Sequence, residues 1–349
     1  MQPARPKPAF RTSAVAQSAR SAVKALWWTA AGRAAQSLVK PQTQSLKSDH
    51  PRPSLAGLRR AYLEAFTKDA RDIAAGLYPA MPDRATQRGR AIAQTADFLN
   101  DARQVEARRR RGGGTEARDL ANSPAYPTYY QQNFHFQSGG WFTPDSAKRY
   151  DAQVEALFSG AAAAMRRRVL SVLMRGLTGQ DHRGLKVVDL ACGTGGFLRD
   201  LKAALPRAQV SGLDLSPAYA QQARVVAGTS VVQANMERLP YGDGSLDAVT
   251  CIYLFHELPP RLRPLIASEM ARVLKPGGLL AFGDSIQPQD APGLARLLDV
   301  FPALFHEPFY QSYAETDLVA LFAAAGLEPQ LTDQAFLTKA LLFRKAALA

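Results

Sequence analysis

The sequence predicts an α/β fold in which a mostly parallel β-sheet is connected by crossover helices. Three observations support this prediction. From Leu185 onward, short apolar runs alternate with helical patterns, as is typical of parallel strands. The apolar run at 187–190 leads directly into a glycine-rich turn. The next run, at 210–216, places an acidic residue at its end, about 20 residues after that turn.

The chain has 349 residues, which suggests two domains or one domain with large additions. We divide it into a basic N-terminal segment (1–48), a helical extension (49–180) and an α/β domain (181–349). No apolar run approaches the roughly 18 residues of a membrane span. The two cysteines, Cys192 and Cys251, give no sign of a disulfide scaffold, so a reducing compartment is the default expectation.

The N-terminal segment accounts for much of the net charge of +13. Residues 1–48 contain eight Lys or Arg and no acidic residue, and the remaining chain carries only +5. This composition resembles an organellar transit peptide, so we predict import, into a chloroplast rather than a mitochondrion, with cleavage before about residue 50. The alternatives are a cytoplasmic protein with a disordered basic tail, or an interfacial anchor built on Trp27 and Trp28 that contacts a membrane peripherally.

The extension at 49–180 is predicted to be helical. Ser54 caps a first helix with an apolar stripe to Leu77, and Asp83 caps a second helix. The arginine run 108–111 is interpreted as a solvated helix end before the loop at 112–114. Thr143 and Pro144 then start a helical stretch to about residue 177, with a break near residue 160.

The glycine-rich turn follows the strand at 187–190 and contains Gly193 and Gly195. Such a turn lets the backbone approach a ligand closely. A dinucleotide site would place a third glycine at position 198, which is Leu198 here. Asp189, at the end of the strand, suits a ligand with an ammonium group better than a ligand with phosphates.

This run resembles motif I of the class I S-adenosylmethionine (SAM)-dependent methyltransferases. The resemblance implies a Rossmann-like seven-stranded sheet and SAM as the cofactor. To this fold we add the helical N-terminal extension and a lid insert at about 286–315, after the fifth strand. We expect the strand order 3-2-1-4-5-7-6 with only the last strand antiparallel, closed by the pair 327–331 and 335–343. The SAM contacts implied around the turn are Asp189, Ala191, Cys192, Gly193, Thr194 and Gly195.

Later segments resemble the same family in the same order. Asp214, followed by Leu215, matches the acid that binds the ribose. Asn235 and Met236 match the segment beside the adenine, with Asn in place of the commoner Asp. The segments at 243–251 and 272–282 match the fourth and fifth strands.

The reactive groups are expected at the end of the fourth strand. There His256 and Glu257 stand side by side. With an ordinary pKa near roughly 6.5, His256 is a candidate general base, and Glu257 would orient it or the substrate. His135, Tyr150 and His306 lie in or near aromatic clusters, and we expect them to line a lid. An equally weighted alternative is that His256 only packs.

The predicted function is therefore methyl transfer from SAM to a small aromatic or lipophilic molecule. The catalytic half also resembles, more loosely, the ubiquinone/menaquinone-biosynthesis C-methyltransferases. An RNA or protein methyltransferase and a non-catalytic SAM-binding assembly factor are the alternatives. We expect no nucleic acid partner, because the fourth strand lacks the motifs of base-modifying enzymes, and we predict no metal site.

Overall fold

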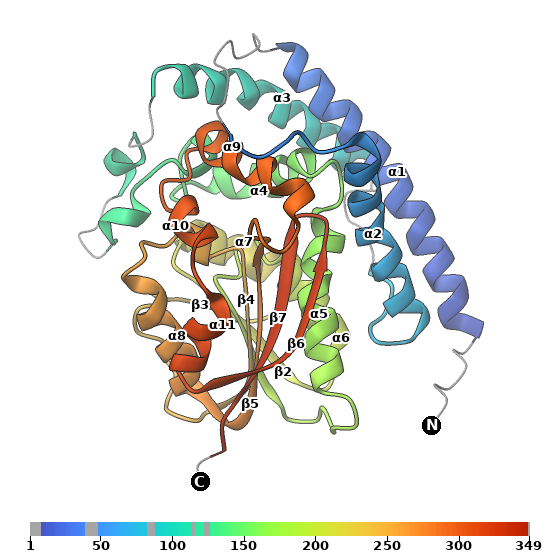
Figure 1. Cartoon of the computed structure of the whole chain (residues 1–349), viewed down its shortest axis with the longest axis vertical. Coiled ribbons are helices and arrows are strands. Elements are labelled where there is room, and N and C mark those ends of the chain that lie inside the picture. Colours follow the sequence, from blue (N-terminus) through green and yellow to red (C-terminus); the bar gives the residue numbers. More distant parts are fainter. Residues whose placement is uncertain (1–7, 39–47, 82–87, 113–115, 122–125, 348–349) are drawn as a thin grey trace.

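The structure is a computed structural model that describes residues 8–38, 48–81, 88–112, 116–121 and 126–347. Figure 1 shows two parts. A sheet domain forms the lower half. A group of helices, which we call the helical cap, covers the upper end of the sheet and continues down one side of it. None of the helices in the described part of the chain is long and apolar enough to cross a membrane.

The sheet of the described residues has seven strands in the order β3-β2-β1-β4-β5-β7-β6. Strand β7 is antiparallel to both of its neighbours, β5 and β6. The other five strands, β1 to β5, pair with one another in parallel. The order and the single antiparallel strand confirm the prediction. The strands are β1 (Lys186–Leu190), β2 (Gln209–Asp214), β3 (Val231–Gln233), β4 (Leu246–Ile252), β5 (Leu274–Ser285), β6 (Leu327–Ala335) and β7 (Thr338–Lys345).

Helices cover both faces of the sheet (Figure 1). One buried cluster joins the sheet to α5 (Ala162–Gly176), α6 (Gly196–Ala204) and α7 (Pro217–Ala227). A second cluster joins the other face to α8 (Leu262–Val273) and α11 (Leu318–Ala324). Neighbouring residues of one strand divide between the clusters, as Val187 and Val188 do, because side chains alternate across a strand. Cys192 and Cys251 are buried as free thiols, one in each cluster.

The helical cap lies over the carboxyl ends of the parallel strands and extends along the outer side of α5. It consists of α1 (Pro8–Leu38), α2 (Leu55–Ala74), α3 (Arg88–Arg110), α4 (Pro144–Leu157), α9 (Ala295–Phe305) and α10 (Tyr310–Ala314). Helices α9 and α10 come from the insert predicted after the fifth strand. The cap is therefore assembled from both ends of the chain.

The predicted helix starts agree with the structure where it describes them. The side chain of Ser54 accepts a hydrogen bond from the Gly57 amide, and that of Thr143 accepts one from Ser146. The break near residue 160 is also present, because Gly160 has a φ of 85° and separates α4 from α5. The cap predicted at Asp83 lies outside the described residues.

The N-terminal segment differs from a disordered tail, because α1 packs against α2, α3 and α4. Trp28 is 1% exposed and lies in a cluster with Ala152 and Ala156 of α4. Lys24 forms a buried ion pair with Glu155, with 2.8 Å between Nζ and Oε1. Cleavage before about residue 50 would remove these contacts from the cap.

The arginine run at 108–111 is less solvated than predicted. Arg108 is 8% exposed and donates hydrogen bonds to the Phe136 carbonyl and to Glu116. Arg109 and Arg110 both pair with Glu106. The prediction of a solvated helix end is wrong for Arg108, because local sequence does not reveal that the loop around Phe136 folds over this helix.

Candidate active site

The glycine-rich turn joins β1 to α6 by a backbone path that requires glycine at Gly195. This residue has a φ of 81°, and a Cβ atom there would lie 2.7 Å from the Cα of Ala223 in α7. Gly193 has a φ of 56°, and a Cβ atom there would meet nothing within 4 Å. A side chain at Gly193 would therefore project into open space, so the turn leaves room for a ligand against its backbone.

Asp214 closes the turn from the end of β2. Its two carboxylate oxygens accept hydrogen bonds from the Gly193 and Ser216 amides, each at 2.8 Å. Burial raises the pKa of Asp214 to about 7, although these amides act in the opposite direction. The carboxylate faces the cavity next to Leu215, as expected for a group that binds ribose hydroxyls.

The turn and Asp214 form one side of a cavity at the carboxyl ends of β1, β2 and β4. The opposite side is formed by Tyr150 of α4 and by the aromatic loop before α4, with Tyr129, Tyr130, Phe134 and Trp141. Of the residues predicted to bind SAM, six line this cavity: Ala191, Gly193, Asp214, Leu215, Asn235 and Met236. Glu257 lies in the same wall and offers a carboxylate to a cation. This set of groups fits the chemistry of SAM. It offers an acid to the ribose, apolar side chains to the adenine and a carboxylate to the sulfonium.

The other four predicted SAM residues support the turn from behind and are not in this cavity wall. Asp189 is buried and accepts a hydrogen bond from Thr250 Oγ1 at 2.7 Å, and burial raises its pKa to about 7. Thr194 donates to Asp151 of α4 at 2.9 Å. Cys192 packs in the core, and Gly195 faces α7. These positions shape the turn rather than face the ligand.

The adenine side has a locally ordered Asn235. Its Oδ1 atom accepts from the Glu237 amide at 2.9 Å, and its Nδ2 atom donates to the Glu237 carboxylate at 3.1 Å. The Asn side chain is thus held in place by the residue two positions later. Met236 is buried beside it, lines the cavity and also belongs to the core.

His256 lies at the end of β4 against an acid that the sequence analysis did not single out. Its Nδ1 atom is 2.5 Å from Oδ1 of Asp284, and the other Asp284 oxygen accepts from the Phe255 amide at 2.8 Å. Burial lowers the pKa of His256, but the carboxylates of Asp284, Glu307 and Glu257 together raise it by more, to about 10. The expected pKa near 6.5 is therefore wrong for this ring. A ring that already carries its proton cannot act as the resting general base.

Three polar side chains from distant segments meet beside His256. The Nε2 atom of His135 is 3.8 Å from Oε1 of Glu257 and 3.4 Å from Oε1 of Glu307. Burial raises the pKa of Glu307 above its ordinary value. The sequence analysis assigned no role to Glu307. The only signal was its place between His306 and Pro308 in the aromatic insert.

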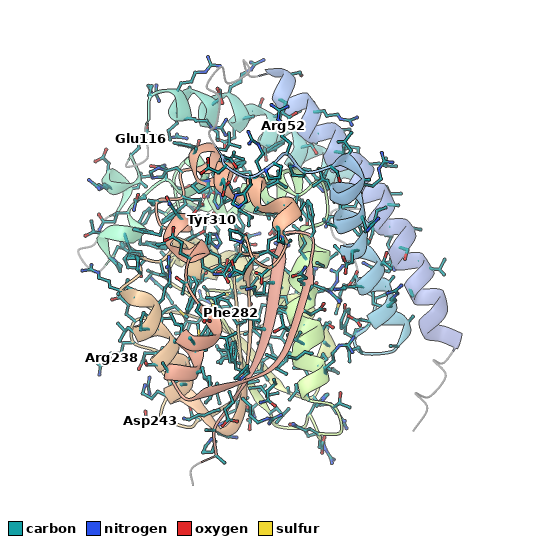
Figure 2. All side chains as sticks on the ribbon, viewed as in Figure 1. Arg52, Glu116, Arg238, Asp243, Phe282 and Tyr310 are labelled. Atoms are coloured by element: carbon teal, nitrogen blue, oxygen red, sulfur yellow. The ribbon has the colours of Figure 1, made fainter. Side chains whose placement is uncertain are left out.

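His306 and Tyr150 occupy different parts of the lid. The Nε2 atom of His306 is 3.1 Å from the Gln132 side-chain oxygen, and its ring contacts Phe136, away from Glu257. Tyr150 packs against Trp141 and Tyr219 and lines the cofactor cavity. Figure 2 shows Tyr310 of α10 near the cap end of the sheet, with Phe282 of β5 further down in the sheet.

A second cavity of about 370 Å³ lies within the cap between α1, α3, α4 and α9. This volume is within the range of small-molecule sites. Most of its wall is apolar, with Phe98, Val105, Leu157 and Phe305 among the lining residues. Tyr150 lines both cavities. The second cavity therefore adjoins the first one at the aromatic cluster.

Comparison with known proteins gives a consistent family. Residues 187–278 match a family described as a methyltransferase domain. A demethylmenaquinone methyltransferase of Beutenbergia cavernae is 32% identical over 190 residues, which are 54% of this chain and 70% of that protein. An uncharacterised methyltransferase of Synechocystis sp. is 37% identical over 41% of this chain and 66% of its own length.

A third relative is a probable phthiotriol/phenolphthiotriol dimycocerosates methyltransferase of Mycobacterium ulcerans. It is 36% identical over 33% of this chain and 45% of its own length. The match with the Synechocystis and Mycobacterium proteins thus spans less than two thirds of their length. The match to the family description covers part of the sheet domain, from β1 into β5, and ends before α9.

Proposed function

Because the chain belongs to the class I SAM-dependent methyltransferases, we propose that it methylates a small, lipophilic acceptor held beneath the helical cap. The observation that carries this proposal is the apolar cavity within the cap, which adjoins the cofactor cavity at Tyr150. The names of the relatives support the same class of acceptor. Demethylmenaquinone is a quinone, and phthiotriol dimycocerosates are lipids.

SAM, when bound, supplies a methyl group on a sulfonium that is open to in-line displacement. The chain's own contribution is to orient the acceptor and to exclude water, and orientation alone can supply roughly 7–11 kcal/mol. Trp141, Tyr150 and Tyr219 form a packed aromatic wall next to the turn. We propose that this wall keeps the acceptor in line with the cofactor and keeps water out.

Glu257 and His256 are proposed to hold the polar group of the acceptor. Glu257 lines the cofactor cavity, and its Oε1 atom is 4.0 Å from Nε2 of His256. Asp284 fixes the other ring nitrogen, so the Nε2 edge keeps one direction. In this arrangement His256 positions the acceptor rather than accepting its proton in the resting state.

The test is transfer of a labelled methyl group. Purified protein and labelled SAM are incubated with extracts of cells of the organism that makes the protein, and the products are analysed by mass spectrometry. We expect a labelled small, lipophilic product. Label in RNA or protein would instead favour those acceptors, and SAM binding without any labelled product would favour an assembly factor.

Variants of His256 and Glu257, the side chains proposed to hold the polar group of the acceptor, refine this test once the product is known. His256→Gln should lower turnover by about 10²-fold, because a misplaced acceptor reacts that much more slowly, while SAM affinity changes little. Glu257→Gln should lower turnover as well and should also weaken SAM binding, since its carboxylate lines the cofactor cavity. Calorimetry with SAM and product formation are measured on the same preparations. Full turnover by both variants would show that these side chains only pack.

We also propose import of the protein into an organelle, a chloroplast in preference to a mitochondrion. The acid-free composition of residues 1–48 supports it. The packing of α1 in the cap argues for retention of this segment after import. Residues 1–50 fused to a fluorescent protein should enter the organelle. Diffuse cytosolic fluorescence would contradict import, and N-terminal sequencing of the mature protein tests retention.

A further inference from the structure

Three metal-ligating side chains converge between the cofactor cavity and the cavity in the cap. They are His135 from the aromatic loop before α4, Glu257 after β4, and Glu307 after α9. Their ligating atoms lie within 4.8 Å of one another. Glu257 lines the first cavity and His135 lines the second. The group therefore sits where the two cavities approach each other.

Glu307 gives an independent reason to expect a ligand. The residue is 2% exposed, and neither of its carboxylate oxygens has a hydrogen-bond partner among the described residues. Burial of a carboxylate without hydrogen bonds is costly, and proteins usually offset that cost with a paired charge or a metal. The facing His135 Nε2 atom lies 3.4 Å from Oε1, outside hydrogen-bonding geometry. The carboxylate thus points into the group with its lone pairs unused.

The distances match those around a bound ion. Metal bonds to imidazole nitrogen and carboxylate oxygen are about 2.0–2.2 Å long. Two such ligands at a tetrahedral angle are then about 3.4 Å apart. The separations from His135 Nε2 to Glu307 and Glu257 are 3.4 and 3.8 Å. Movements of a few tenths of an ångström would bring all three atoms to bonding distance.

The loop that carries His135 is built rigidly. His135 itself has a φ of 56°, a conformation that costs a non-glycine residue free energy and needs support. Asn133 gives that support: its side chain accepts from the Ala117 amide at 2.8 Å and donates to the Gln137 carbonyl at 2.9 Å. The His135 ring also meets Trp141 and Phe305 edge to face. The ligand is therefore held in place before any ion binds.

We propose that His135, Glu257 and Glu307 bind one divalent transition-metal ion, such as Mn²⁺, Fe²⁺, Co²⁺ or Zn²⁺. One imidazole and two carboxylates form a mixed nitrogen and oxygen set, which suits these ions better than the all-oxygen preference of Mg²⁺ or Ca²⁺. The sequence analysis predicted no metal site, because its three ligands are separated by more than 100 residues and by 50 residues along the chain.

The ion would hold an oxygen atom of the acceptor at the junction of the two cavities. Three protein ligands leave at least one position open on a four-coordinate ion. This part of the inference rests on the proposed function. Metal binding itself does not, so the two can fail separately.

The experiment measures binding of Co²⁺ to the full chain after treatment with a chelator. Calorimetry gives the stoichiometry and affinity, and the visible absorption of Co²⁺ reports its coordination. We expect one ion per chain. Glu307→Gln and His135→Gln should weaken binding by roughly tenfold or more, since even changes outside the ligand set often cost that much. Glu315→Gln, on the exposed end of α10, is the control and should bind as the wild type does.

Thermal unfolding covers the case in which a variant folds poorly. Glu307→Gln should leave the melting temperature of the metal-free protein unchanged or higher, since it removes a buried carboxylate without hydrogen bonds, and it should abolish the rise in melting temperature that Co²⁺ causes in the wild type. The proposal is overturned if the wild type binds no stoichiometric ion, or if Glu307→Gln binds Co²⁺ with wild-type affinity. SAM affinity, measured alongside, should stay the same in every variant except Glu257→Gln.

Discussion

In the sheet domain, the groups that face the cofactor lie close together in the sequence, whereas the cap gathers its polar groups from distant positions. Gly193 and Asp214 are 21 residues apart and hydrogen-bond directly. His135 precedes the sheet domain in the sequence and Glu307 lies near its end, yet their side chains are in contact. A cofactor site built from neighbouring strands and turns is kept in every protein that keeps those strands and turns. A site gathered from distant positions changes whenever the cap is built differently, so one fold can serve many acceptors.

The strongest test of this division concerns the joint between the two parts. Arg167 of α5 donates to both Asp69 oxygens of α2, each at 2.7 Å, and both side chains are buried. Arg167→Met leaves the carboxylate buried without its partner, so we expect a loss of about 3–5 kcal/mol in the free energy of unfolding. Chemical denaturation measures it, with Arg183→Met, in an exposed ion pair, as the control. If the cap unfolds in a separate transition, the two parts are independent domains.

Within the sheet domain, Asp189 should make stability depend on pH. Burial raises its pKa from 3.8 to about 7. A raised carboxyl pKa means that its charged form is disfavoured in the folded state. Its contribution to stability is therefore present below about pH 4 and lost as the pH rises through 7.

Asp189→Asn removes that charge and should stabilise the protein at pH 8, by on the order of 4 kcal/mol at most, and by less than half as much at pH 5, which lies nearer the unfolded pKa. Melting temperatures of both proteins at the two pH values test this. An equal difference at pH 5 and pH 8 would show that the carboxylate does not titrate in this range.

The backbone of the turn gives the third test. Gly195→Ala adds a Cβ atom against Ala223 and forces alanine to a φ of 81°. Strain and overpacking together should cost about 2–4 kcal/mol and lower SAM affinity. Gly242→Ala, where a Cβ atom meets nothing within 4 Å, is the matched control. Thermal melting with and without SAM separates the two effects, and equal melting of both variants would contradict the assignment.

The smallest expected effect is on cofactor affinity at Asp214. Hydrogen bonds to a charged group contribute about 1.5–3 kcal/mol. Asp214→Ala should therefore weaken SAM binding tenfold or more, since about 1.4 kcal/mol corresponds to tenfold. Asn235→Ala should have a weaker effect, because its amide already bonds to Glu237. Calorimetry that gives the same affinity for Asp214→Ala and wild type would remove the assignment.

The contrast also explains what the sequence could predict. The strands, the turn at Gly195 and the place of Asp214 follow from local patterns, because hydrophobic period, glycines and acids at strand ends act over a few residues. The order of the strands came from the resemblance to the methyltransferase family. Asp284 and Glu307 were not singled out, since their meaning depends on which strand ends and loops become neighbours. The pKa of His256 was mispredicted for the same reason, because Asp284 on β5 raises it most. The helix at 8–38 has partners in α4 that no local pattern reveals.

The long reach of α1 has a consequence for the order of events during synthesis. Lys24 and Glu155 are 131 residues apart, and Ala152 and Ala156 of α4, which pack against Trp28, are almost as distant from it. At about 5–20 residues per second, the ribosome makes that stretch in roughly 7–26 s. During this interval the face of α1 that packs against α4 has no partner. The basic, acid-free sequence of α1 is then accessible to a targeting receptor that binds nascent chains. The same segment can thus serve as a targeting signal during synthesis and as a packed helix of the cap in the complete protein.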